Sequence, residues 1–131
     1  MNGNPIPKSK KLPKIGKLQK EADRLMQIIN KIQSPKCFLC GRDTQVAHHF
    51  FPKSVSANLR YNWDNLIPLC NGCHMRLHQS GDPGYEMDIR YKKGEGWYEQ
   101  LSKLKRQSIK INREYYQTVL EKLQNRKDRF I

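Results

Sequence analysis

The sequence predicts an α+β fold, in which two short strands and one helix form a small core between an N-terminal and a C-terminal helical flank. Two apolar runs of strand character are followed by a helical pattern in the middle of the chain, and amphipathic helical patterns stand before and after them. A chain of 131 residues can bury one modest core but is too short for two domains of ordinary size. One domain with helical extensions is therefore expected.

The N-terminal segment, residues 1–17, holds five lysines, three prolines and no acidic residue. A segment of this composition supports neither a core nor a regular helix. It is predicted to be a flexible basic arm.

Residues 18–36 have the pattern of an amphipathic helix. Apolar residues recur at alternating steps of four and three positions, which places them on one helix face, and Pro35 ends the pattern. These residues are Leu18, Ala22, Leu25, Ile29 and Ile32. The face packs either on the core of its own chain or on a second copy of the chain, as a homodimer.

Residues 37–80 hold the predicted core, in the order strand, loop, strand, helix. The first strand spans residues 45–51 and is closed by Pro52, and the second spans residues 66–69. Asn71 is the expected N-cap of the helix that follows.

The C-terminal half divides into a loop and a helical region. Residues 81–96 contain four glycines and one proline and are predicted to be a connecting loop with little regular structure. Residues 97–131 are predicted to be a basic helical region, with an apolar face at helical spacing. That face contains Tyr116, Val119, Leu120 and Leu123.

The charge of the chain indicates a polyanionic partner. Lys and Arg number 25 against 12 Asp and Glu, which gives a formal net charge of +13. Nucleic acid is favoured over an anionic membrane surface as the partner. The nine basic residues in 101–131 form either a solvated helix face or contacts to a nucleic-acid backbone.

No apolar run approaches the ~18 residues that span a bilayer, and the N-terminus does not resemble a signal peptide. We therefore expect no membrane partner and a cytoplasmic location, which is the host cell cytoplasm if a phage encodes the protein.

Four cysteines form two pairs, each with two residues between its members. Cys37 and Cys40 are one pair, Cys70 and Cys73 are the other, and 29 residues separate the pairs. Paired thiols at this spacing are typical of a closed tetrahedral zinc site, and a reducing cytosol disfavours disulfides. A structural Zn²⁺ ion is predicted, which in so small a chain contributes directly to folding.

All four histidines lie near the cysteines. His48 and His49 are adjacent in the first predicted strand, so their side chains leave opposite faces, whereas His74 and His78 share one face of the predicted helix. Two helix histidines at this spacing can bind one ion together. His48 adds a third imidazole from the strand, and His49 remains for proton transfer.

These residues, in this order and spacing, resemble the motif of the HNH (ββα-metal) endonucleases. The resemblance covers residues 37–78, about a third of the chain. It implies a ββα-metal core stapled by the four-cysteine zinc. The residues that carry it are His48, His49, Asn65, Cys70, Cys73, His74 and His78.

A further similarity connects the chain to the NinG (Rap) recombination nucleases of lambdoid phages. It rests on residues 59–65, 85–91 and 114–117 and on the basic helical segment before the first cysteine pair. This similarity implies a role in phage DNA recombination, with branched DNA such as a Holliday junction or D-loop as the substrate.

The resemblance implies roles for individual residues. His49 would be the general base, and His48, His74 and His78 would hold the catalytic metal. Asn65 would fix the loop that presents the base, although local sequence alone describes it equally well as a turn residue. The nearest basic residues to the motif, which are expected to contact DNA phosphate, are Lys53, Arg60 and Arg76.

The implied activity is metal-dependent hydrolysis of DNA that leaves 5′-phosphate and 3′-hydroxyl ends. Mg²⁺ or Mn²⁺ is the expected catalytic ion by abundance, while three imidazoles also suit Zn²⁺ or Ni²⁺. Two alternatives stay open. One is a non-catalytic zinc module that binds nucleic acid, and the other is a sequence-specific HNH nuclease.

Overall fold

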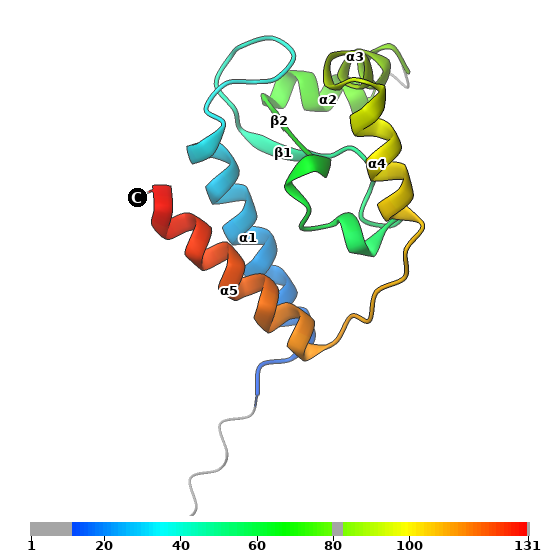
Figure 1. Ribbon diagram of the computed structural model, residues 1–131. Helices are drawn as coiled ribbons and strands as arrows, with labels where there is room; N and C mark the ends of the chain where they lie inside the picture. Colours follow the sequence, from blue (N-terminus) through cyan, green and yellow to red (C-terminus); the bar gives the residue numbers. More distant parts are fainter. Residues whose placement is uncertain (1–11, 80–82, 131) are drawn as a thin grey trace, which may run out of the picture.

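The computed structural model describes residues 12–79 and 83–130 and confirms the α+β fold (Figure 1). Residues 1–11 of the predicted basic arm lie outside the described residues, whereas residues 15–17 belong to the first helix, so the prediction of a helix-free arm is wrong there and the helix predicted at 18–36 begins and ends three residues earlier. The helices are α1 (Ile15–Gln33), α2 (Asn71–Gln79), α3 (Pro83–Lys93), α4 (Glu95–Lys105) and α5 (Arg113–Phe130). The strands are β1 (Val46–His49) and β2 (Leu66–Leu69), and two short 3₁₀ turns, η1 (Ala57–Leu59) and η2 (Trp63–Asn65), lie between them.

The two strands form an antiparallel sheet in which Val46 pairs with Leu69 and His49 pairs with Leu66. The first strand is shorter than the predicted span of 45–51, although a backbone hydrogen bond from Phe50 to Asn65 continues the pairing past its end. The chain bends at Phe50 and Phe51, so the prediction of a strand through residue 51 is wrong at its end, whereas the second strand has the predicted bounds.

Helix α1 packs beside α5, and both helices begin at the same end of the molecule (Figure 1). The buried face of α1 includes Ala22, Leu25 and Ile29, as its spacing predicts, whereas Ile32 is 40% exposed. Its partners are Val119 and Leu123 of α5 together with residues of both strands. The apolar face of α1 thus packs on the core of its own chain, which was one of the two alternatives that the sequence left open.

Helix α1 also holds the sheet through a side chain. The Gln27 amide accepts a hydrogen bond from the Ala47 N–H at 2.8 Å and donates one to the Ala47 carbonyl at 3.2 Å. An edge strand leaves such groups without a strand partner. Gln27 therefore takes the place of a third strand at this position of β1.

The segment predicted to be a connecting loop, residues 81–96, contains helix α3 and the start of α4, so that prediction is wrong for Pro83–Lys93. The proline stands at the first helical position, where a missing N–H is tolerated, and Gly94 separates the two helices with a φ of 96°. Ile89 is fully buried in the core, which supplies the packing energy that local propensity lacks.

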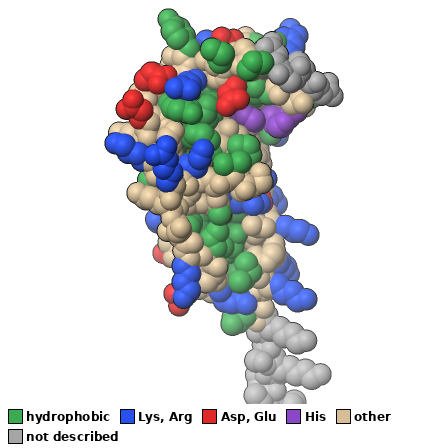
Figure 2. Space-filling model, turned by 90° about the vertical axis from the view of Figure 1, so that its right-hand side faces the viewer, with side chains coloured by type: hydrophobic (Ala, Val, Ile, Leu, Met, Phe, Trp, Pro, Cys, Tyr) green, Lys and Arg blue, Asp and Glu red, His purple; other side chains and the backbone are tan. Residues whose placement is uncertain are grey.

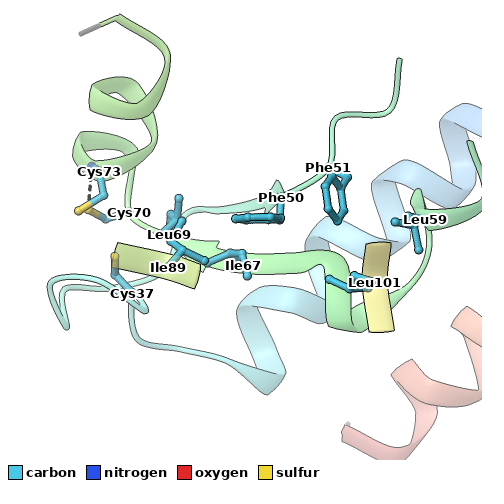
Figure 3. Close-up of a cluster of buried hydrophobic side chains, with 10 residues drawn as sticks. All are labelled: Cys37, Phe50, Phe51, Leu59, Ile67, Leu69, Cys70, Cys73, Ile89 and Leu101. Carbon is cyan, nitrogen blue, oxygen red and sulfur yellow. Dashed lines mark hydrogen bonds between the residues drawn. The ribbon is translucent and has the colours of Figure 1, made fainter. Parts of the chain in front are cut away.

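Two hydrophobic clusters share the sheet. One cluster lies between the strands and helices α3 and α4 and contains Phe50, Ile67, Leu69, Ile89 and Leu101 (Figure 3). The other joins α1 and α5 to the opposite side of the strands. The sheet is therefore packed on both sides, against α3 and α4 in one cluster and against α1 and α5 in the other.

The surface shows a local concentration of histidine. In the view of Figure 2 the histidines form one patch, and Lys and Arg side chains border a band of hydrophobic side chains in the lower half of the same face. No helix in the described ranges combines the length and apolar character that crossing a membrane requires.

The Gln27 contact generates a stability prediction. Gln27→Leu leaves the Ala47 N–H and carbonyl without partners in a partly buried place, which costs about 1–3 kcal/mol. We expect the midpoint of thermal unfolding to fall, measured by circular dichroism. Gln117→Leu, on an exposed position of α5, is the matched control. Equal midpoints for the two variants would show that the amide does not hold β1.

Candidate metal centre and active site

The four cysteines meet in one cluster, in which the sulfur atoms all lie within 4.8 Å of one another. Cys37 and Cys40 come from the turn after α1, while Cys70 and Cys73 lie at the start of α2. All four are free thiols. They are positioned to bind a metal ion, as their spacing predicts.

Local backbone structure explains how each pair is presented. Gly41 has a φ of 77° and donates its N–H to the Cys37 carbonyl at 3.0 Å, which closes a tight turn around the first pair. At the second pair, the His74 N–H bonds to the Cys70 carbonyl, so α2 is capped by Cys70 and not by the predicted Asn71. The Cys70 sulfur accepts the Cys73 N–H at 3.4 Å, which takes the capping role (Figure 3).

The pKa values of the clustered cysteine thiols favour the binding of a metal cation. Burial raises the pKa of the Cys37 thiol, but backbone N–H donors outweigh burial and bring that pKa to about 6. Burial and the neighbouring sulfur atoms raise the pKa of Cys73 to about 12. Four thiolates this close repel one another, and a bound metal ion removes that penalty by coordinating them.

Three histidines form a second cluster, with ring nitrogens that all lie within 4.8 Å of one another. His48 comes from β1, whereas His74 and His78 lie one helical turn apart on α2. The His48 ring centroid is 5.3 Å from that of His74 and 5.6 Å from that of His78. Burial, and then the neighbouring histidines, lower the pKa of His48 to about 4, which keeps it in the neutral form that ligates metals.

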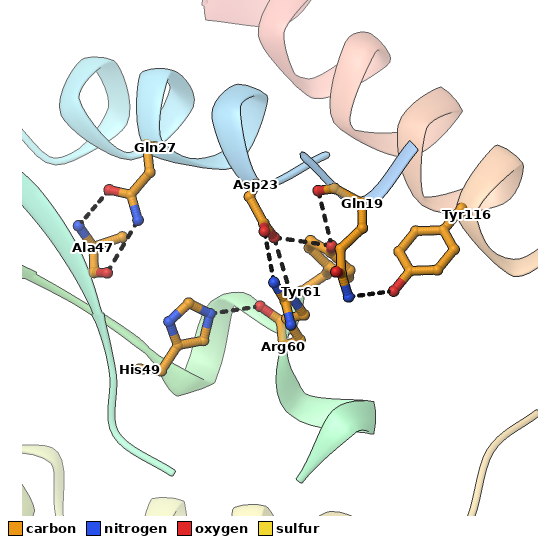
Figure 4. A network of polar contacts seen from close by, with 8 residues as sticks. All are labelled: Gln19, Asp23, Gln27, Ala47, His49, Arg60, Tyr61 and Tyr116. Atoms are coloured by element: carbon orange, nitrogen blue, oxygen red, sulfur yellow. Dashed lines mark hydrogen bonds and ion pairs between the residues drawn. The ribbon is translucent and has the colours of Figure 1, made fainter. Parts of the chain in front are cut away.

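His49 leaves the opposite side of the strand and is 8% exposed. Its Nε2 lies 2.9 Å from the Arg60 carbonyl oxygen (Figure 4). Because a carbonyl can only accept, Nε2 carries the proton and Nδ1 keeps a free lone pair. Burial lowers the pKa of His49, which favours this neutral form.

All four histidines line one cavity of about 440 Å³ despite their different directions from β1. Lys53 lines the same cavity from the segment after the strand. The cavity therefore combines three side chains that could hold a metal ion, one oriented imidazole and one cation. We call it the histidine cavity.

Asn65 is fully buried and binds the segment between the strands. Its Oδ1 accepts the Phe51 N–H at 2.8 Å, and its Nδ2 donates to the carbonyls of Phe51 and Leu59 at 3.1 and 3.2 Å. The side chain thus joins both ends of this segment next to the carbonyl that contacts His49. These contacts are those expected of a loop-fixing residue, and they exceed what a plain turn residue makes.

Arg60 is placed differently from the expectation that it contacts DNA phosphate. Its guanidinium forms a two-point ion pair with Asp23 of α1, at 2.6 and 3.0 Å, and both side chains are largely buried. The Tyr61 hydroxyl donates to the same carboxylate at 2.9 Å. Burial raises the pKa of Asp23, but the hydrogen bonds from Arg60 and Tyr61 outweigh burial and hold the pKa below its usual range.

Sequence reasoning missed the part that α1 plays here. Gln19, Asp23 and Gln27 form a row with a spacing of four, which lies beside the apolar face of the helix. Gln19 donates to the Tyr116 hydroxyl at 2.8 Å, and the other two hold Arg60 and Ala47 (Figure 4). The spacing of these three polar residues could have indicated a second functional face of the helix, but their partners lie far away in the sequence and could not be identified from it.

The remaining predicted DNA contacts lie on exposed surface. Lys53 borders the histidine cavity. Arg76 lies on α2 and donates to the Tyr85 hydroxyl at 3.2 Å. The structure thus groups Lys53 with the histidines and places Arg76 toward α3.

The cysteine cluster generates a prediction about metal content. We expect the purified protein to hold one tightly bound divalent ion that Cys40→Ser removes, because three thiolates and a hydroxyl no longer complete the site. Elemental analysis after gel filtration measures the loss as one ion per chain. His74→Ala is the control that retains this ion. An unchanged ion count in Cys40→Ser would contradict the site.

The Asn65 network generates a second prediction. Asn65→Ala leaves buried backbone groups of Phe51 and Leu59 without partners, so we expect a loss of at least about 2 kcal/mol in the free energy of unfolding. Denaturant titration in the presence of metal measures it. Asn62→Ala removes a single contact, to the Asp64 N–H, and is expected to cost about 1 kcal/mol or less. A smaller loss at position 65 than at 62 would show that Asn65 does not fix the segment.

One segment of the chain is similar to a known protein family. Residues 37–80 match the family model described as HNH endonuclease. Searches of curated proteins and of solved structures found no match to the chain, so the resemblance to the NinG nucleases stays a prediction. The matched segment contains both strands, both cysteine pairs and all four histidines. This segment, about a third of the chain, is therefore similar to HNH endonuclease domains, which suggests a nuclease or nucleic-acid-binding function.

Proposed function

We propose that this protein is a metal-dependent DNA endonuclease that leaves 5′-phosphate and 3′-hydroxyl ends. The observation that carries the proposal is the meeting of His48, His74 and His78 in the cavity that His49 also lines. A structural metal site would not require a fourth imidazole that is oriented separately from the three ligands. Phosphodiester hydrolysis uses a metal ion, which the three histidines could hold, and a general base, which His49 could supply.

The donor set fits a catalytic divalent ion. His48, His74 and His78 would hold it, and the low pKa of His48 supports the neutral, ligating form. When bound, such an ion supplies Lewis-acid stabilisation of charge on the phosphate and on the departing 3′ oxygen. Imidazole ligands suit Mn²⁺, Ni²⁺ or Zn²⁺ better than Mg²⁺, although Mg²⁺ is the more abundant ion in cells.

His49 is the proposed general base. The Arg60 carbonyl accepts its Nε2 proton, so the Nδ1 lone pair is available to take a proton from the attacking water. The same carbonyl stabilises the imidazolium that forms. Asp23 supports this geometry at one remove, because it holds the side chain of the residue whose carbonyl orients the base.

The cysteine cluster is proposed to hold structural Zn²⁺. Four thiolates favour this ion and leave no position open for substrate. The cluster lies at the start of α2, the helix that carries His74 and His78. Its role is to fix the helix that supplies two of the three catalytic ligands.

Charge supports DNA as the substrate. Lys53 borders the histidine cavity, and the net charge of +13 favours sequence-independent binding to phosphate. A branched recombination intermediate, such as a Holliday junction or D-loop, is the substrate that the NinG resemblance suggests.

The proposal predicts the effect of removing the base. His49→Ala is expected to slow cleavage of plasmid DNA at least about 100-fold, because positioned general bases contribute about 10²–10⁴-fold. DNA binding, measured by gel shift without added metal, should stay within about twofold because the cationic surface is unchanged.

Ser54→Ala is the matched control, since Ser54 lines the same cavity without a proposed role. It should cleave at the wild-type rate. Wild-type cleavage by His49→Ala would disprove the assignment of the base. A repurified wild-type protein that binds DNA but never nicks it, with Mg²⁺ or Mn²⁺, would show a non-catalytic binding module.

A further inference from the structure

A second cavity, of about 420 Å³, lies between α5 and the segment that contains η1 and η2. We call it the aromatic groove. It is lined by aromatic, amide and cationic side chains over a floor that includes Val119 and Leu123. It shares no lining residue with the histidine cavity, and the proposed reaction does not use it.

Three aromatic rings from two separate elements line the groove. Tyr61 and Trp63 come from the segment between the strands, and Tyr115 comes from the first turn of α5. The ring centroids of Tyr61 and Tyr115 are 6.4 Å apart. All three side chains are only partly buried, so each keeps surface that a flat ligand can contact.

Three cations line the same groove from one face of α5. Lys122, Arg126 and Arg129 are spaced at i, i+4 and i+7, which aligns them along the helix. The Arg126 guanidinium lies 4.5 Å from the Trp63 ring centroid, and its Nε donates to Gln33 at 2.8 Å. The aromatic and cationic walls are therefore in contact.

The positive charge of the groove has no internal counterion. No carboxylate is among its lining residues, and across residues 12–79 and 83–130 neither Lys122 nor Arg129 makes an ion pair or a side-chain hydrogen bond. Burial and the nearby charge of Arg129 lower the pKa of Arg126. A bound anion would relieve this crowding of like charges.

Two amide side chains add hydrogen-bonding groups to the aromatic groove. Asn125 is exposed at the rim, and the Asn62 Nδ2 remains available, because that side chain uses only its Oδ1 to cap η2. Amides offer donors and acceptors to base edges. The groove thus combines flat apolar faces, phosphate-binding cations and base-edge hydrogen-bonding groups.

We propose that the aromatic groove binds an unpaired DNA strand, with bases against the aromatic rings and phosphates against the α5 cations. This inference rests on the proposed DNA substrate. Paired bases hide their faces in the helical stack, so a groove with exposed rings distinguishes unpaired from paired DNA. A membrane surface or an acidic peptide would use the cations but not the rings.

The groove is connected to the proposed active site through one segment of chain. Asn62 and Trp63 line the groove, while the carbonyl of Arg60, two residues away from Asn62, orients His49. A strand held in the groove would lie against the segment that positions the base. The inferred substrate is therefore DNA with an unpaired stretch close to the bond that is cut.

The test measures binding by fluorescence polarisation with no catalytic metal added, so that no cleavage is needed. Four labelled probes of about ten nucleotides are compared: oligothymidylate, oligouridylate, an abasic strand of equal charge, and a duplex. Stacking is worth about 1–3 kcal/mol per base, and 1.4 kcal/mol is tenfold in affinity. We expect oligothymidylate to bind at least about tenfold more tightly than the abasic strand.

Three exposed substitutions on α5 localise the binding. Asn125→Glu places a carboxylate in the groove and is expected to weaken oligothymidylate binding about tenfold. Asn125→Gln should bind as the wild type does. Gln117→Glu carries the same change of charge at an exposed position of α5 outside the groove and should change binding by less than about threefold, through general charge alone.

Trp63→Leu examines the stacking surface. It should weaken oligothymidylate binding about tenfold, the effect of losing one stacked base, while binding of the abasic strand stays unchanged. Circular dichroism and metal content confirm that the variant is folded. If it does not fold, the Asn125 variants alone decide the result.

Equal binding of oligothymidylate and the abasic strand, or wild-type binding by Asn125→Glu, would overturn the inference. Tighter binding of oligouridylate than of oligothymidylate would overturn the choice of DNA. The two proposals fail separately. A protein that never cuts DNA but shows base-dependent strand binding refutes the nuclease alone, and one that cuts DNA without that preference refutes the groove alone.

Discussion

The packing of four sulfur atoms within 4.8 Å of one another is the constraint on which the rest of the structure depends. It ties the turn after α1 to the first turn of α2, and α2 carries His74 and His78 to the side of β1 from which His48 projects. Structural metal binding contributes about 10–16 kcal/mol in small domains, comparable with a net stability of about 5–15 kcal/mol. The geometry of the histidine cavity is therefore coupled to the state of the cysteines.

Helix α1 gives the second support, although it lies outside the segment that matches the HNH family. Its apolar face packs on α5 and the strands, and its polar row holds the sheet edge and the segment between the strands. Arg60 shows the consequence most clearly. Its side chain is fixed by Asp23, and its carbonyl is thereby placed to orient the His49 ring. An N-terminal helix thus takes part in positioning an imidazole of the segment that matches the HNH family.

The segment between the strands has two sides with different chemistry. On one side Asn65 and the Arg60 carbonyl define the surroundings of His49. On the other side Tyr61 and Trp63 face the cations of α5. A rigid segment with these two sides links the proposed chemistry of the histidine cavity to the proposed binding of an unpaired strand.

Features that depend on short-range spacing could be predicted from the sequence. Two thiols separated by two residues can share an ion, two histidines a helical turn apart share a face, and apolar periodicity identified α1 and α5. Prediction from the sequence failed for α3, because the glycines in and around this segment are typical of a loop, while burial of Ile89 outweighs the weak local helix propensity. The pairing of Arg60 with Asp23 and the contact of Arg126 with Trp63 could be seen only in the folded structure. Those contacts join residues that are distant in the chain. They form because complete helices pack together, and no local sequence pattern encodes that packing.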